Sequence, residues 1–552
     1  MLNIRDQLST LLRTVVADQA DDLLDAAKWE MPKDATFGDL SCPIAFKLAS
    51  RQRLAPPLVA KELARRLGEL AVASPLSAWV ERIDSVHGFV NVHLSQSALS
   101  SVLQQVFIEG GAYGTSRAGA GQRILIEFVS ANPTGPLSVA HGRQAAVGDA
   151  LGNVLRAQGY DVTKEYYLND EGRQIEMLGR SLRARYVQQL GQDEPFPEDG
   201  YHGAYVTEVA AELVKQHGDA LRDAPLERFV EIGMASQLER IKDDLTRFGL
   251  TFDRWESQRQ LRIDGHIDRA LEALRAQDCL FEQDGATWFA STRFGDDKDR
   301  VVKKQTGELT YLAPDIAYHQ LKFQRGYGRV INLWGPDHHG YIARIKAAVT
   351  ALGQAADRLT VKIVQLVTLT RAGKVVPMSK RQGEFVTFRE IMQEVGVDAT
   401  RYFYLMRTAE SHLDFDLELA KSQSQENPVY YVQYAHARIC SVIENFTKQL
   451  PEVAADPNVD GTLLDQPEER LMLRQLFQFP SVVTACAQSL EAQGVTVYLQ
   501  KLAELFHVFY TKHRVISDDL ARSRARLALV QATRIVLANG LGLLGVSAPQ
   551  RM

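Results

Sequence analysis

The sequence has few cysteines and no long uninterrupted apolar run. Four cysteines occur among 552 residues, at Cys42, Cys279, Cys440 and Cys486, and no two of them form a C-x-x-C pair. This spacing argues against a structural zinc site and is typical of reduced thiols in a cytoplasmic protein. No stretch of 18 or more uncharged apolar residues occurs. We therefore expect no membrane span, no membrane partner and a cytoplasmic location.

An excess of positive charge is also missing. The chain has 63 basic and 68 acidic residues, a net charge of −5. The total does not indicate a nucleic-acid binder, so any RNA partner must meet positive charge gathered on one face. The apolar share of 45% is ordinary for a globular protein, and the length suits roughly three to five domains.

The order of predicted elements indicates an α/β protein with an all-α C-terminal region. Residues 123–129 and 162–168 are typical of strands, and a helical segment from 141 to about 158 lies between them. A strand–helix–strand unit of this spacing predicts a Rossmann-type parallel sheet. We predict three domains: an α/β domain over 1–110, the parallel-sheet domain over 111–389, and a helical domain over 390–552. The parallel-sheet domain is expected to carry a mostly helical insertion at about 183–290.

A turn rich in proline and glycine joins the first predicted strand of the sheet to its helix. It reads ANPTGPLSVAHG over residues 131–142. Ligands of parallel sheets bind beyond the carboxyl ends of the strands, and a helix that begins near His141 and Gly142 would direct free N–H groups at a triphosphate. A stiff turn with a structurally satisfied histidine is the alternative, and this segment alone does not decide between them.

Three further segments carry candidate ligand chemistry. The basic loop PMSKRQG, residues 377–383, suits phosphate, because a loop cation can meet the charge on a leaving pyrophosphate; a solvated turn is the commoner use of such a run. Tyr311 and Asp315 share one face of a predicted helix, and a carboxylate beside a phenol can receive a guanidinium. Asp315 could instead only counter the helix dipole. The turn over 334–340 offers Asp337 and His338 to ribose hydroxyls; adjacent histidines point apart, which argues against a metal.

Taken together, in this order and spacing, these segments closely resemble the class I arginyl-tRNA synthetases of bacterial type. Residues 131–141 lie where that family has its HIGH signature, and residues 377–381 where it has KMSKR. The run from Asp398 to Phe403 is similar to its DALR signature, and the stretch around Lys47 is similar to its N-terminal domain, which touches the tRNA elbow. The resemblance covers nearly the whole chain.

The resemblance implies a set of site residues. The backbone end of arginine would be held by Glu127, Ser130 and Asn132, and its guanidinium by Tyr311 and Asp315. Catalytic roles would fall to Ser138, His141 and Lys380. ATP would contact Pro133, Thr134, Gly135, Pro136, Leu137, Val139, Ala140, Gly142, Gly335, Asp337, His338, Met378, Ser379 and Arg381. tRNA would contact Tyr430, Tyr434, Tyr510 and Met552, with helix-core packing as the alternative, which we favour for Tyr434.

The resemblance also implies a reaction and its partners. Arginine would be activated with Mg²⁺-ATP and joined to its tRNA by a monomer that binds no metal of its own. The chain departs from the usual signatures at Ser138 and Ala140, where the family has histidine and glycine, and at Pro377, where it has lysine. Two rivals are kept. One is a non-catalytic tRNA-binding paralogue, which only the altered stretch from Ser138 to Ala140 supports. The other is a nucleotidyl transferase that uses the same phosphate site on another small molecule, which the helical domain over 390–552 argues against.

Overall fold

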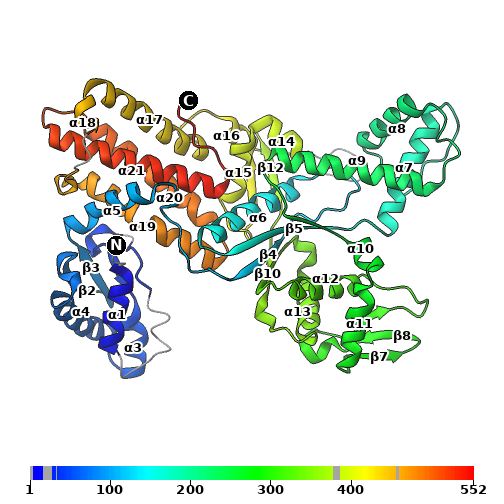
Figure 1. Ribbon diagram of the computed structural model, residues 1–552, viewed down its shortest axis with the longest axis horizontal. Helices are drawn as coiled ribbons and strands as arrows, with labels where there is room; N and C mark the ends of the chain where they lie inside the picture. The colour runs from blue at the N-terminus through cyan, green and yellow to red at the C-terminus, as the bar shows by residue number, and fades with distance from the viewer. Residues whose placement is uncertain (1–3, 17–27, 33, 377–385, 456–458) are drawn as a thin grey trace.

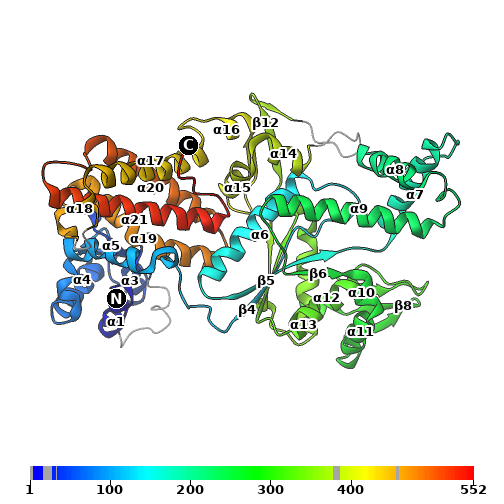
Figure 2. The same ribbon diagram turned by 45° about the horizontal axis from the view of Figure 1, so that its top comes forward.

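The computed structural model describes residues 4–16, 28–32, 34–376, 386–455 and 459–552. A parallel sheet lies at its centre, a helical bundle with the N-terminal region lies on one side, and a helical arm extends on the other (Figures 1 and 2). The predicted fold class is confirmed: an α/β chain with a parallel central sheet, an α/β N-terminal region and a helical bundle at the C-terminus.

The N-terminal region pairs a small antiparallel sheet with helices. Its elements are α1 (Ile4–Val16), β1 (Leu40–Cys42), α3 (Ile44–Gln52), α4 (Pro56–Val72), β2 (Val80–Val86), β3 (Phe89–Leu94) and α5 (Gln96–Glu109). The strands run in the order β1-β3-β2. Helix α1 buries Leu8 and Leu12, which are four residues apart and so share a face. Helix α5 packs against the C-terminal bundle, which joins the two regions.

The central sheet has five parallel strands in the order β11-β10-β4-β5-β6. They are β4 (Arg123–Glu127), β5 (Asp161–Leu168), β6 (Arg254–Ser257), β10 (Arg329–Trp334) and β11 (Leu359–Ile363). Helix α6 (Val139–Ala157) connects β4 to β5, while α12 (Leu312–Gln324) and α13 (Ile342–Ala351) flank β10 along the chain. Strand β4 lies between β10 and β5, where the strand order reverses. A crevice at the carboxyl ends of these strands is the expected ligand site.

The helical arm consists of α7 (Arg173–Gln189), α8 (Ala204–His217) and α9 (Leu226–Arg247), and it has a core of its own. The sequence interpretation placed a mostly helical insertion at about 183–290 and did not foresee β6, which joins the central sheet. A four-residue strand is too short for its periodicity to stand out. The chain continues through α10 (Gln258–Ile263) and α11 (His266–Ala276) to a sheet of β7 (Leu280–Gln283), β8 (Ala286–Phe289) and β9 (Arg300–Lys303).

A third small sheet lies between the central sheet and the bundle. It contains β12 (Val367–Arg371), β13 (Lys374–Val375) and β14 (Leu413–Asp416), accompanied by α14 (Phe388–Val395), α15 (Val397–Leu405) and α16 (Leu417–Lys421). Strand β14 interrupts the stretch after residue 390 that the sequence interpretation describes as helical. The bundle itself comprises α17 (Pro428–Gln449), α18 (Pro451–Ala455), α19 (Pro467–Ser489), α20 (Gln493–Lys512) and α21 (Leu520–Leu544).

Helix α21 is the one described helix that is long and apolar enough to cross a membrane by length and composition. It contacts α17, α19 and α20, and 61% of its apolar window is buried inside the protein. These features are typical of the core helix of a bundle.

Candidate active site

A cavity of about 550 Å³ opens at the carboxyl ends of β4, β5 and β10. The parallel sheet brings segments distant in the sequence to this edge, as its topology requires. The lining residues come from the ends of these strands and from α6, α10, α12 and the turn after β10: Glu127, Val129, Ser130, Ala131, Asn132, His141, Gln144, Tyr167, Asn169, Gln258, Tyr311, Asp315, Tyr318, His319, Leu333, Trp334, Gly335, Asp337, His338 and Tyr341.

The backbone directly after β4 is strained. Val129 has φ +68° and Ser130 has φ +37°, and both values lie in the left-handed region that a β-branched residue rarely adopts. The Ser130 hydroxyl donates to Glu127 Oε1 at 3.0 Å and accepts the Tyr167 N–H at 3.1 Å. This conformation therefore ties β4 to β5 at the mouth of the cavity.

Asp315 supplies a carboxylate to the cavity from the first turn of α12. Its Oδ2 accepts a hydrogen bond of 2.8 Å from the phenol of Tyr341, a residue that the sequence interpretation missed. Burial raises the pKa of Asp315 from 3.8 to about 7, although the Tyr341 hydrogen bond opposes the shift. Tyr311 occupies the N-cap position of α12 and is 73% exposed, so it lies at the rim of the cavity.

His319 is hydrogen-bonded to the backbone of Asp315, one turn earlier on α12. Its Nδ1 lies 2.8 Å from the Asp315 carbonyl oxygen, and its Nε2 lies 2.8 Å from Asn332 Nδ2. Burial lowers the pKa of His319 to about 3, so the ring is neutral at working pH. An Nδ1–H that donates to the carbonyl and an Nε2 that accepts from the amide satisfy both contacts.

Glu127 forms a buried ion pair with Lys322 of α12. Lys322 Nζ donates to Glu127 Oε2 at 2.7 Å and to Asn332 Oδ1 at 3.0 Å. The Lys322 side chain is 0% exposed and that of Glu127 is 7% exposed. The two residues are 195 positions apart in the chain, so this partner of Glu127 was not foreseen. The pair fixes the Glu127 carboxylate, because an unpaired charge at this depth would be strongly destabilising.

Ser138 and His141 form one unit at the start of α6. Ser138 is the N-cap residue, its N–H donates to His141 Nδ1 at 3.1 Å, and its Oγ lies 3.1 Å from the same nitrogen. A backbone N–H can only donate, so Nδ1 accepts and the neutral ring carries its proton on Nε2. His141 lines the cavity. Ser138 lines neither this cavity nor the smaller one beside it, which is described below.

Gly142 faces the protein interior. Its N–H already donates to the Ser138 carbonyl at 3.0 Å, and a Cβ at this position would lie 2.4 Å from the Phe388 ring. Phe388 therefore requires a residue without a side chain here. The expectation of a free Gly142 N–H directed at phosphate does not fit this geometry.

A second cavity, of about 360 Å³, adjoins the first and shares Ala131, Asn132 and His141 with it. The arm forms its far wall. Tyr205 Oη donates to the Thr134 carbonyl at 2.8 Å, and Asn132 Nδ2 donates to Gln174 Oε1 at 2.6 Å. The arm thus supports the turn that the sequence interpretation assigns to ATP.

The structure brings most of the predicted site residues together. All five arginine candidates line the larger cavity, as do Gly335, Asp337 and His338, and the smaller cavity is lined by Thr134, Gly135 and Pro136. Pro133, Leu137, Val139, Ala140 and Gly142 line neither. Met378, Ser379, Lys380 and Arg381 lie outside the described residues. Residues missed by the sequence interpretation include Gln144, Tyr167, Trp334 and Tyr341; for Tyr341 the available signal was its position directly after the GPDHHG turn.

An aromatic face on α17 and α20 unites the three tyrosines predicted to contact tRNA. The rings of Tyr430 and Tyr434 stack at 6.0 Å. Arg438 donates to Tyr434 Oη at 3.2 Å and lies 4.9 Å from the centre of the Tyr510 ring. Tyr510 packs against the main hydrophobic core, whereas Tyr434 is part-buried against Tyr430 and His507, so the choice between tRNA contact and packing for Tyr434 stays a prediction. Met552 is 54% exposed at the chain end.

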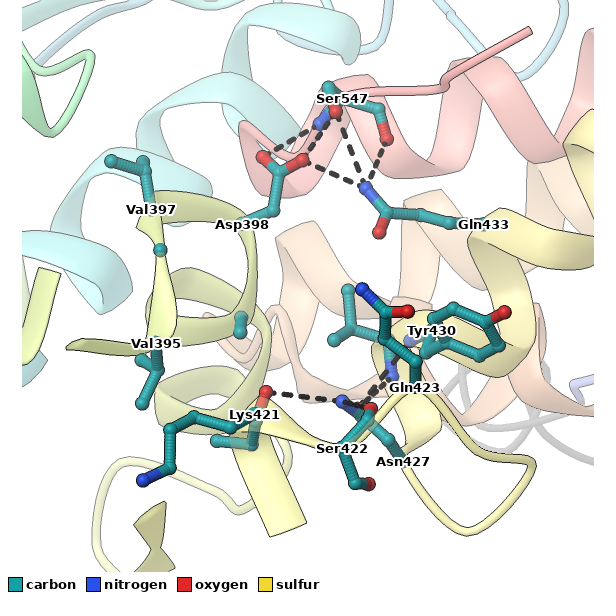
Figure 3. Close-up of a pocket in the computed structure, with 14 residues that line it drawn as sticks. Val395, Val397, Asp398, Lys421, Ser422, Gln423, Asn427, Tyr430, Gln433 and Ser547 are labelled. Carbon is teal, nitrogen blue, oxygen red and sulfur yellow. Dashed lines mark hydrogen bonds between the residues drawn. The ribbon is translucent and has the colours of Figure 1, made fainter. Parts of the chain in front are cut away.

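A hollow of about 460 Å³ lies beside Tyr430, between α15, α16 and α17 (Figure 3). Asp398 and Gln433 meet Ser547 at one side of it, as Figure 3 shows. The tail after α21 is thereby attached both to α15 and to α17.

Three family models match the chain. They are described as the arginyl tRNA synthetase N-terminal domain over residues 3–94, the class I (R) tRNA synthetase catalytic domain over 102–412, and the DALR anticodon binding domain over 432–552. The second model alone spans more than half of the chain.

Curated proteins and solved structures agree with these models. The arginine–tRNA ligase of Anoxybacillus flavithermus is 46% identical over 548 residues, which cover 98% of this chain and 97% of the relative. That of Bacillus subtilis is 46% identical over 95% of this chain and 94% of its own length. The crystal structure of a putative arginyl-tRNA synthetase from Campylobacter jejuni superposes with a TM-score of 0.77 at 32% identity, covering 83% of this chain and all of that one. The Thermus thermophilus arginyl-tRNA synthetase, at 21% identity and a TM-score of 0.79 over both full lengths, shares the fold.

Proposed function

This chain belongs to the class I arginyl-tRNA synthetases, and we propose that it ligates L-arginine to its tRNA with ATP in the cavity at the carboxyl ends of β4, β5 and β10. One observation carries the assignment of the arginine end. Asp315 directs a part-buried carboxylate at this cavity, with the phenol of Tyr341 bound to it and Tyr311 at the rim. A guanidinium presents a planar fork of donors that such a carboxylate accepts.

The backbone end of arginine is assigned to Glu127, Ser130 and Asn132. These residues lie at the end of β4 and directly after it, they line the cavity, and they offer acceptors for an ammonium group. Since the Glu127 carboxylate is already held by Lys322 and Ser130, its position is set before the substrate arrives. Such preorganisation lowers the cost of binding.

ATP, with Mg²⁺ as part of the substrate, is assigned to the turn over 133–137, to His141 and to the 335–338 turn. In the first step a carboxylate oxygen of arginine bonds to the α-phosphorus, and the bond to the leaving pyrophosphate breaks. The Nε2–H of His141 is a fixed donor for charge on the phosphates. Lys380, with its neighbours Met378, Ser379 and Arg381, is proposed to meet the pyrophosphate. Ser138 orients His141.

In the second step a hydroxyl of the terminal tRNA ribose takes the arginyl group and AMP leaves. Neither step needs a nucleophile from the protein, so the residues contribute position and charge. We assign splayed anticodon bases to the face of Tyr430, Tyr434, Arg438 and Tyr510, because aromatic and guanidinium planes stack on bases. Met552 is assigned to the same contact.

The enzyme acts as a cytoplasmic monomer, with an elbow-binding domain over 1–110, a catalytic domain over 111–389 and an anticodon-binding domain over 390–552. Arginine-dependent exchange of pyrophosphate into ATP, measured with and without tRNA, tests the function. Exchange that no amino acid supports would favour a non-catalytic tRNA-binding protein. Exchange driven by another small molecule would favour a different nucleotidyl transferase.

A further inference from the structure

Arg401, on α15, is buried at the point where three parts of the chain meet. Its side chain is 1% exposed. Nη1 donates to Asp149 Oδ2 on α6 at 2.8 Å and to the Leu544 carbonyl at the end of α21 at 3.3 Å. Nε and Nη2 donate to the Phe248 carbonyl, just beyond α9 of the arm, at 2.9 and 2.7 Å. One guanidinium therefore binds helix α6, which carries His141 in its first turn, the arm and the C-terminal bundle.

The surroundings are shaped for this cation. Phe248 and Leu544 lie at the C-terminal ends of α9 and α21, where helix dipoles favour positive charge. Lys164 Nζ donates to the other Asp149 oxygen at 2.5 Å, so both carboxylate oxygens are paired. A Cβ on Gly545, which has φ +68°, would lie 2.4 Å from Arg401 Nη1. Apolar residues of similar volume often stabilise a buried contact as well as an ion pair does. Stability alone therefore does not explain why charged residues lie at this contact.

The first turn of the same helix is also attached to the bundle. Asp398, three residues before Arg401, accepts the Ser547 N–H at 3.0 Å and a hydrogen bond from the Ser547 hydroxyl. Its Oδ2 also accepts from Gln433 on α17 at 2.8 Å (Figure 3). Helix α17 carries Tyr430 and Tyr434. Helix α15 therefore contacts the helix of the aromatic face through Asp398 and, one turn later, the helix of His141 through Arg401.

A second route leads from Arg401 to the signature turn. The guanidinium stacks over the Phe248 ring at 4.2 Å, and that ring meets Phe388 edge-on at 4.8 Å. Phe388 in turn occupies the space beside Gly142. A shift of α15 relative to the bundle would thus reach the start of α6 both through Asp149 and through the two phenylalanines.

We propose that Arg401 is a positioning residue that couples occupation of the aromatic face by the tRNA anticodon arm to the placement of α6 in the ATP site. The proposal rests on the function proposed above. Arg401 touches no substrate. A displacement of α17 and the tail after α21 would move α15, and Arg401 would transmit that movement to Asp149 and Phe248 through its hydrogen bonds. A correct anticodon should therefore raise kcat and leave the KM for ATP and arginine almost unchanged.

The test compares two tRNA transcripts, the cognate one and one with its three anticodon nucleotides replaced. Aminoacylation kcat is measured with both at saturating concentration, which leaves the fold of the protein untouched. For the unmodified enzyme we expect replacement to lower kcat about tenfold, within the range usual for coupled sites. Arg401→Lys keeps the positive charge but loses the planar set of N–H donors that the guanidinium supplies. With the cognate transcript the kcat of this variant should already be about tenfold low, and replacing the anticodon should lower it less than twofold further.

Two further variants separate coupling from stability. Arg526→Lys makes the same substitution in a similarly buried pair, with Glu469 inside the bundle, and should retain the full anticodon response. Asp398→Asn weakens the attachment of the first turn of α15 to the bundle and should lose part of that response even if Arg401→Lys fails to fold.

An equal fold-loss of kcat with both transcripts in Arg401→Lys and Asp398→Asn would overturn the coupling and leave a structural role. A wild-type kcat that ignores the anticodon would overturn it as well. An enzyme that charges neither transcript with arginine would instead overturn the proposed function.

Discussion

The carboxylate of Asp315 and the phenol of Tyr341 are joined by a 2.8 Å hydrogen bond, although the two residues are 26 positions apart in the sequence. One carboxylate oxygen is thereby engaged, and the position of the group is set by a turn that follows a different strand. The charge state of this one carboxylate governs the first prediction.

Arginine should bind more weakly as pH falls below about 7. Burial raises the pKa of Asp315 from 3.8 to about 7, so below that pH the free enzyme holds the neutral acid. A guanidinium needs the carboxylate, so binding releases a proton there. The arginine KM should be flat above pH 7 and rise towards about tenfold per pH unit below it. Asp315→Asn is the control, with a high arginine KM and no pH dependence; a pH slope that survives in this variant would point to another group.

Removal of Lys322 should destabilise the catalytic region. Lys322→Met leaves the buried Glu127 carboxylate without its cation, and the expected loss is about 3–5 kcal/mol in the free energy of unfolding. Glu127→Gln in the same chain removes the unpaired charge and should recover more than half of that loss. Denaturant unfolding of the unmodified protein, Lys322→Met and the double variant measures the free energy of unfolding of each. Equal stability of the single and double variants would show that the unpaired Glu127 charge does not cause the loss.

His141 should matter far more than Ser138. Ser138→Ala keeps the backbone N–H that fixes His141 Nδ1, so pyrophosphate exchange should fall by less than about fivefold, the loss of one ordinary hydrogen bond. His141→Ala removes the donor itself and should cost roughly 10²–10³ in rate. Both rates are measured with saturating tRNA. Equal losses would mean that the Ser138 hydroxyl acts on the phosphates directly.

Binding of tRNA should depend on salt despite the net charge of −5. Each phosphate met by a lysine or arginine releases counterions, so affinity should fall more than about tenfold between 50 and 200 mM salt. Filter binding of labelled tRNA measures the slope. A flat affinity would count against tRNA as the partner.

Local spacing predicted much of this protein and long-range pairing very little. The turn after β4, the Tyr311–Asp315 spacing and the βαβ unit are visible in short stretches of sequence, because each depends on neighbours in the chain. Lys322 was missed because an isolated lysine on a helix gives no sign of a partner 195 positions away. Ser138 was expected to have a catalytic role because of its place in the signature; a serine before a helix is also a good N-cap, and in that position Ser138 contacts His141.

Tyr434 decides whether the aromatic face binds RNA or only packs. Its ring stacks on Tyr430 and on His507 at 5.9 Å, and it does not pack against the core. If a base stacks there, Tyr434→Ala should weaken tRNA binding by about 1–3 kcal/mol, and Tyr434→Phe, which keeps the ring, should lose far less. Tyr431 is the matched control on the same helix, because it packs against the core. Tyr431→Ala should lower the melting temperature of the bundle, while Tyr434→Ala should leave it nearly unchanged. Fluorescence titration with tRNA and thermal unfolding of all three variants separate the two roles. If the Tyr434→Ala protein binds tRNA normally but has a lower melting temperature, Tyr434 has a packing role and the assignment of base stacking to this face is wrong.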